Sequence, residues 1–189
     1  MISTMIAAVT LAVLFACNTN TTTVAPGVQI SQDSLVRLGD YLVNAIGCDD
    51  CHTPKKMGPQ GPELDLDYRF AGHLANRPLG KPDTSVLKTG WLLFSYDLTA
   101  MLGPWGISYA ANISSDATGI GNWSEEQFIK ALRHGKLKGL DESRPLLPPM
   151  PWQNFAKLKD QDIKAIFAYL KSTKPVENRV PEWKKMNEL

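Results

Sequence analysis

Apolar residues recur at helical spacing in three stretches of this chain. Residues 31–34 supply side chains that cap helices, and an apolar face follows at Leu35, Leu38, Leu42, Ala45 and Ile46. A second stretch opens at Ser124 with the capping-box pattern Ser-x-x-Gln and ends at Gly135, a residue type that often stops helices. A third starts near Asp160 and stops at Pro175. The pattern predicts helices near both ends of a domain and one helix between them.

Gly39 interrupts the apolar face of the first predicted helix. A glycine inside a helix costs up to about 1 kcal/mol relative to alanine. Either another helix approaches closely at Gly39, or the residue is a tolerated surface glycine.

Residues 53–122 do not continue the helical pattern. They hold 15 Gly and Pro residues in 70 positions, too many for long helices or a regular sheet. Short strands are predicted at 91–96 and 107–109. We interpret the stretch as a loop-rich insertion that wraps against the core of one domain. That domain spans residues 31–181, within the usual size range, and a tail follows at 182–189.

The chain begins with an apolar stretch typical of export signals. Residues 1–16 carry no acidic residue and are fewer than the roughly 20 that span a membrane, so they predict a signal peptide. The segment 14–17 resembles a bacterial lipobox, which predicts lipidation of Cys17 and a place on the periplasmic side of a bacterial membrane. Phe15 is bulky for that motif and no Lys or Arg precedes it. An ordinary signal peptide cleaved nearby is the alternative.

Residues 17–30 contain no charge and little that could pack. We expect them to form a flexible tether between a lipid anchor and the domain. The formal net charge of the chain is +1, and nothing in its charge pattern indicates nucleic-acid binding.

A Cys-x-x-Cys-His pentad at residues 48–52 carries the main chemical signal. Two thiols three positions apart can add to the two vinyl groups on one edge of a haem. The imidazole of the next residue can then bind the iron as its proximal ligand. We therefore predict one covalently attached haem c, held by Cys48, Cys51 and His52.

A zinc site and a thiol-redox site are the alternatives for this pentad. A structural zinc site needs four ligands, and the chain offers beyond the pentad only Cys17, His73 and His134, none of them in a second pair. A thioredoxin-like Cys-x-x-Cys lies within a βαβ pattern, and no such alternation precedes Cys48. Haem attachment is the favoured interpretation.

The sixth iron ligand is predicted to be Met150. Three prolines flank it and force an extended loop, which lowers the entropy cost of holding one side chain against a metal. His plus thioether ligation fills the coordination sphere and raises the reduction potential. Met101 is the alternative thioether, and His73 or His134 would give two histidine ligands. Met57 follows the pentad too closely, and Met186 lies in the polar tail.

The order of features along the chain resembles that of a class I cytochrome c. The order is helix, pentad, capped helix, proline-flanked Met150 and terminal helix. Residues 112–128 and the motif at 144–152 are similar, more narrowly, to bacterial membrane-associated c-type cytochromes. Those include the haem domains of cytochrome subunits that serve periplasmic dehydrogenases. The resemblance covers about residues 31–181 and is weak over 53–105. This chain has one pentad where multihaem relatives have several.

The resemblance implies an all-α cytochrome c fold in which the first helix crosses the last, with haem between them. Gly39 and Tyr41 would then face the last helix, at Phe167, Tyr169 or Leu170. It also implies covalent haem on Cys48 and Cys51 and iron ligation by His52 and Met150.

These features predict a single-haem electron carrier without catalytic residues of its own. It would accept electrons from a dehydrogenase or quinol-linked donor and pass them to an oxidase or another acceptor. A haem enzyme or gas sensor with an open iron position is one alternative, and a haem subunit of a larger dehydrogenase complex is another.

Several polar residues have weaker predicted roles. Candidate donors to the haem propionates are Arg144, Trp105, Trp152 and Lys138, although surface or packing roles are the simpler interpretation. Asp49 and Asp50 are expected in a solvated turn. Lys136, Lys138, Lys184 and Lys185 either guide docking to an acidic partner or solvate a face.

Overall fold

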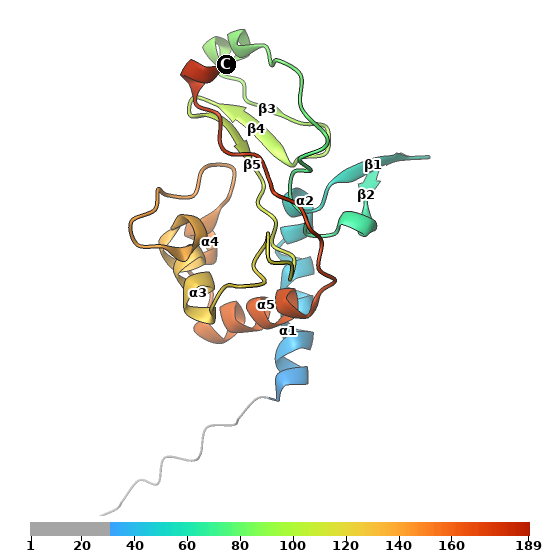
Figure 1. Cartoon of the computed structure of the whole chain (residues 1–189), viewed down its shortest axis with the longest axis vertical. Helices are drawn as coiled ribbons and strands as arrows, with labels where there is room; N and C mark the ends of the chain where they lie inside the picture. Colours follow the sequence, from blue (N-terminus) through green and yellow to red (C-terminus); the bar gives the residue numbers. More distant parts are fainter. Residues whose placement is uncertain (1–30) are drawn as a thin grey trace, which may run out of the picture.

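The computed structural model describes residues 31–189. The predicted signal peptide at 1–16, the tether at 17–30 and the lipidation site Cys17 lie outside the described residues. The helices are α1 (Gln32–Ala45), α2 (Cys48–His52), α3 (Glu125–His134), α4 (Trp152–Phe155) and α5 (Asp160–Ser172). Short 3-10 turns occur at Leu66–Tyr68, Thr84–Thr89, Leu137–Gly139 and Met186–Glu188. Figure 1 shows α1, α3, α4 and α5 gathered at one end of the molecule and a small sheet at the other.

The first helix, α1, packs directly against α5. Gly39 lies at the crossing, where a Cβ atom would come within 2.6 Å of the Tyr169 Cβ and of the Ala165 carbonyl carbon. The prediction that a helix approaches closely at Gly39 is therefore confirmed. Tyr41, in contrast, is 67% exposed, so the prediction that it faces α5 is wrong. It lies two residues from Gly39, about 200° around a helix, and so cannot share its face.

The predicted capping box is present at the start of α3. The Ser124 hydroxyl accepts a hydrogen bond from Gln127 N at 3.2 Å, and the Gln127 side chain accepts one from Ser124 N at 3.0 Å. Gly135 ends the helix in the left-handed region at φ 60°. The main core lies between α1, α3 and α5 and consists of Val43, Phe70, Ile120, Phe128, Leu132, Ile163, Ile166 and Leu170.

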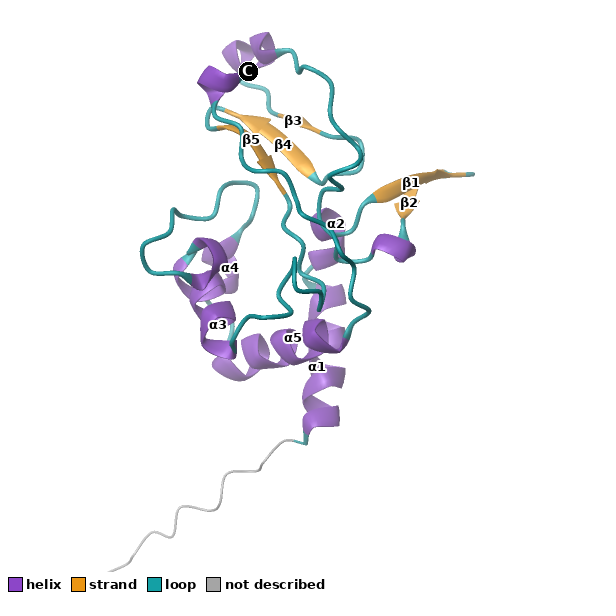
Figure 2. Ribbon diagram, in the orientation of Figure 1, coloured by secondary structure: helices purple, strands orange, loops and turns teal. Residues whose placement is uncertain are grey.

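The predicted all-α fold is wrong, because the chain contains two small antiparallel sheets. Strands β1 (Lys55–Gly58) and β2 (Gly61–Leu64) form a hairpin. Strands β3 (Leu93–Phe94), β4 (Ala100–Gly103) and β5 (Gly106–Tyr109) form a three-stranded sheet in that order. Figure 2 shows the strands of both sheets in orange. Both sheets lie between α2 and α3 in the sequence. The short strands expected at 91–96 and 107–109 correspond to β3 and β5.

The two faces of the three-stranded sheet differ. Ala100, Leu102 and Ile107 are buried together in a small core with Leu87, Leu93 and Leu189 around it. Met101 and Ser108 are cross-strand partners, so their side chains share the opposite face. The insertion thus has a core of its own, and Met101 and Ser108 on its second face are buried as well.

Within residues 31–189, none of the helices combines the length and the apolar character needed to cross a membrane.

Candidate functional site

The pentad forms a helix of its own, separate from α1. Helix α1 ends at its C-cap Ile46, and Gly47 adopts the left-handed conformation at φ 74° before α2 starts at Cys48. A non-glycine residue would be strained there. Cys48 and Cys51 lie three residues apart on α2, which places both thiols on one side of a single turn. Two thiols placed in this way can reach two attachment points on one haem edge.

Both thiols are free and partly buried. Burial, reinforced by the charge of Asp49, raises the pKa of Cys48 to about 12. Burial also raises the pKa of Cys51. Redox-active cysteines react as the thiolate, which a low pKa favours, so the raised pKa values count against the thiol-redox alternative. Among residues 31–189 no three His, Cys, Asp or Glu side chains gather into a group suited to a metal ion.

His52 ends α2 with its imidazole already oriented. Its Nδ1 lies 2.7 Å from the Ala111 carbonyl oxygen, a contact that requires the proton on Nδ1. Burial lowers the pKa of His52, which favours the neutral ring. The nitrogen Nε2 is therefore left with its lone pair, the form that binds a metal. Pentad and imidazole together fit a covalently attached haem.

The carbonyl that orients His52 is itself held in place. The next residue, Asn112, is buried, and its side-chain amide donates to Val176 O at 2.8 Å. Its Oδ1 accepts hydrogen bonds from the backbone and the hydroxyl of Ser114. This network fixes the turn that presents Ala111 O. The network gives a structural role to Asn112, the first residue of the stretch 112–128. The sequence did not reveal this link to His52.

Asp49 is buried, so the expectation of a solvated turn is wrong at this position. Arg69 donates to both of its carboxylate oxygens, with Nη2 2.6 Å from Oδ2. Thr53 donates to Oδ1 at 2.5 Å. Arg69 Nη1 reaches the Tyr169 hydroxyl at 3.1 Å and so links the pentad to α5. The pair raises the pKa of Arg69, chiefly through the hydrogen bond from its guanidinium to Asp49.

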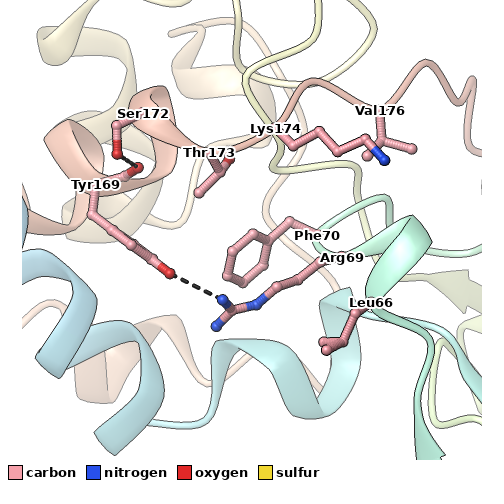
Figure 3. Close-up of a pocket in the computed structure, with 8 residues that line it drawn as sticks. All are labelled: Leu66, Arg69, Phe70, Tyr169, Ser172, Thr173, Lys174 and Val176. Carbon is pink, nitrogen blue, oxygen red and sulfur yellow. Dashed lines mark hydrogen bonds between the residues drawn. The ribbon is translucent and has the colours of Figure 1, made fainter.

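Arg69 and Tyr169 also line a cavity of about 250 Å³, drawn in Figure 3. The cavity is lined by Leu66, Arg69, Phe70, Tyr169, Ser172, Thr173, Lys174 and Val176. None of these residues is a predicted haem ligand. The cavity is separate from the pentad thiols and from Met150.

Met150 lies in the loop between α3 and α4. Leu146 N donates to Gly135 O at 2.7 Å, which fixes the beginning of the proline-rich segment next to the end of α3. The Met150 side chain packs against the main core, and Cys48 packs against the same core. The predicted sixth ligand and one of the two thiols therefore both border the main core.

The alternative ligands occupy different environments. Met101 is 5% exposed on the sheet face that it shares with Ser108. His73 is buried with its Nδ1 2.7 Å from the Thr99 hydroxyl. His134 is the exposed last residue of α3. Met57 is 70% exposed in β1, and Met186 is exposed near the C-terminus.

Three of the four predicted propionate donors already have protein contacts. Trp105 Nε1 donates to Ser108 Oγ at 3.3 Å, and Arg144 donates to Pro145 O while its guanidinium stacks on Trp183. The Trp152 ring packs over Gly135. Lys138 is exposed.

Comparison with known proteins reveals relatives that are all named as dehydrogenase subunits. The chain is 34% identical over 140 residues to the gluconate 2-dehydrogenase cytochrome c subunit of Pantoea cypripedii. It is 29% identical over 158 residues to the cytochrome c subunit of the quinone alcohol dehydrogenase of Gluconobacter oxydans (strain 621H). It is 30% identical over 146 residues to the fructose dehydrogenase cytochrome subunit of Gluconobacter japonicus. No family model matches the chain.

These alignments cover 74%, 82% and 76% of the chain, respectively. They cover 23%, 25% and 22% of the three relatives, so the chain spans about a quarter of their length. The resemblance to cytochrome c subunits of dehydrogenases is confirmed over most of the chain.

Proposed function

We propose that this chain is a single-haem electron-transfer protein, with haem c attached to Cys48 and Cys51 of the domain at residues 31–181. The observation that carries the proposal is the hydrogen bond from His52 Nδ1 to Ala111 O. It fixes the ring and leaves Nε2 available on the same helix as the two thiols. Bound haem would supply one iron that alternates between Fe(II) and Fe(III).

Met150 is the proposed sixth ligand. Its loop contains three prolines, and its side chain packs on the core that also contacts Cys48. A rigid loop lowers the entropy cost of presenting the thioether. Six-coordinate iron leaves no open position for a substrate, so this arrangement favours electron transfer over catalysis.

The names of the relatives support a dehydrogenase as the electron donor. We propose that electrons then pass to an oxidase or another acceptor. Because those relatives are named as subunits of dehydrogenases, a haem subunit within a larger dehydrogenase complex is the second candidate function. Copurification of a catalytic subunit with the full-length chain would favour this candidate, and recovery of a monomer would favour a separate carrier.

The proposed site of action is the periplasmic face of a bacterial membrane, with the chain exported and lipidated at Cys17. The sequence of residues 14–17 supports this. Intact-mass measurement of the mature protein tests it. An acylated Cys17 at the N-terminus is expected, and an unmodified N-terminus at another residue would remove the anchor from the account.

Absorption spectroscopy of the haem-loaded protein tests the ligand assignment. Ferric haem ligated by methionine sulfur shows a weak long-wavelength band, which Met150→Ala should abolish together with a fall in reduction potential. Met101→Ala and the exposed control Met57→Ala should retain the band. Loss of the band in Met101→Ala but not in Met150→Ala would assign the other thioether. Rapid carbon monoxide binding to the wild-type ferrous protein would indicate an open iron position and contradict the proposal.

A further inference from the structure

The proline-rich segment 147–151, which carries Met150, can form few backbone hydrogen bonds. Pro148, Pro149 and Pro151 lack N–H groups and therefore cannot donate backbone hydrogen bonds. The N–H of Met150 donates to Leu147 O at 3.3 Å, within the same segment. Trp152 N in turn donates to Met150 O at 2.9 Å. These bonds shape the segment locally and do not attach it to the rest of the domain.

Leu146 N, just before the segment, donates to Gly135 O at the end of α3. Within residues 147–151 themselves, one hydrogen bond reaches a distant element. Ser108 Oγ in β5 lies 2.6 Å from the carbonyl oxygen of Pro148, two residues before Met150. Among the described residues 31–189, this is the one hydrogen bond found between segment 147–151 and an element far away in the sequence. Figure 1 shows the orange loop after α3 rising beside β5.

The Ser108 hydroxyl is placed to donate to that carbonyl. It is 7% exposed and accepts a hydrogen bond from Trp105 Nε1 at 3.3 Å. A hydroxyl has a single hydrogen, so the short contact with Pro148 O takes precedence over Met101 O at 3.4 Å. The donor hydrogen of Ser108 and one of its two acceptor lone pairs are therefore used.

The three-stranded sheet is built so that Ser108 can make this contact. Ala100, Leu102 and Ile107 bury one face in a small core. Ser108 and its cross-strand partner Met101 belong to the other face, the one that meets Pro148. The small core therefore fixes the sheet, and the sheet presents the hydroxyl.

We propose that Ser108 is a positioning residue that holds the sixth-ligand loop against the inserted sheet. The inference rests on the proposed function, in which Met150 binds the iron. In this role, the three-stranded sheet of the insertion limits how often Met150 leaves the iron. Without the hydroxyl, the loop opens more often and external ligands compete better for the iron.

Imidazole binding to the ferric haem-loaded protein measures this opening. Ser108→Ala should raise the apparent imidazole affinity roughly fivefold, the factor that corresponds to losing one net hydrogen bond. Ser108→Thr retains the hydroxyl and should bind imidazole as the wild type does. Ser95→Ala is the matched control, because the Ser95 hydroxyl donates to Asp97 at 2.6 Å and does not touch the Met150 loop. It should leave the imidazole affinity unchanged even if it lowers stability.

A second pair of variants covers the case in which Ser108→Ala does not fold. Thr and Val have the same shape and differ in the hydroxyl, so Ser108→Val should bind imidazole several-fold more tightly than Ser108→Thr. The role of Ser108 would be overturned if Ser108→Ala bound imidazole as the wild type does and Ser108→Val bound it as Ser108→Thr does. Met150 ligation would still stand in that case, provided that the wild type shows the methionine band. Absence of that band from the wild type would overturn both Met150 ligation and the Ser108 inference.

Discussion

Replacing Arg69 with methionine should destabilise the domain, because it leaves the Asp49 carboxylate buried without its cation. The Asp49 side chain is 10% exposed, and Arg69 contacts both of its oxygens. Removing one partner of a fully buried ion pair costs about 3–5 kcal/mol. The Arg69 side chain is 31% exposed, so water can partly replace it, and Thr53 still donates to Asp49. We therefore expect a loss of roughly 2–3 kcal/mol, below the range for a fully buried pair.

Thermal and urea denaturation of the haem-loaded protein, followed by circular dichroism, measures this loss. For a domain of this size the expected loss lowers the melting temperature by roughly 4–12 °C. Lys130→Met is the matched control, since it breaks an ion pair whose Asp141 side chain is 74% exposed, and its melting temperature should not change. The double variant Asp49→Asn with Arg69→Met should recover part of the loss, because the unpaired charge is gone. If Arg69→Met and Lys130→Met have the same melting temperature, the contacts of Arg69 with Asp49 do not stabilise the haem-attachment helix α2.

Two further changes have predictable effects on stability. Gly39→Ala forces a Cβ atom against the Tyr169 Cβ and the backbone of α5, so an overpacking cost of about 1–3 kcal/mol should exceed a helix-propensity gain of about 0.5–1 kcal/mol. If Gly39→Ala instead raises the urea midpoint of unfolding, α1 and α5 can move apart at little cost to accommodate the added methyl group. Burial lowers the pKa of His73, although the nearby charge of Asp97 opposes this shift. As the pH falls, His73 is therefore protonated at a higher pH in the unfolded chain than in the folded chain. Stability should fall as the pH drops below about 6.5, with a shallower slope in His73→Gln, and parallel curves for the two proteins would contradict this reasoning.

The sequence predicted α1, α3 and α5 closely, because apolar period and capping residues are local signals. Gln32–Ala45, Glu125–His134 and Asp160–Ser172 all start within a residue or two of their predicted caps. The pentad and the proline frame of Met150 are likewise local, so the candidate ligands could be named before the fold.

The sheets were largely missed for physical reasons. Strand β4 is buried at every position from Ala100 to Gly103, so it shows no alternation of polar and apolar residues. The hairpin of β1 and β2 is rich in Lys, Gly and Pro, residue types depleted in strands. Only pairing between strands reveals either feature.

The contacts that shape the site join residues far apart in the sequence. Arg69 meets Asp49 across 20 positions, His52 meets Ala111 across 59, and Ser108 meets Pro148 across 40. Helix periodicity carries no information about such pairs. For that reason Asp49 was expected in solvent, and the Ala111 carbonyl and the Ser108 hydroxyl were not anticipated.

The intact mass of the purified protein under denaturing conditions tests the central claim most directly. Covalent attachment through Cys48 and Cys51 predicts a mass increase of one haem group that survives unfolding. The double variant Cys48→Ala with Cys51→Ala should lack this increase. An unmodified polypeptide mass for the wild type, after expression with the haem-attachment machinery, would contradict the account.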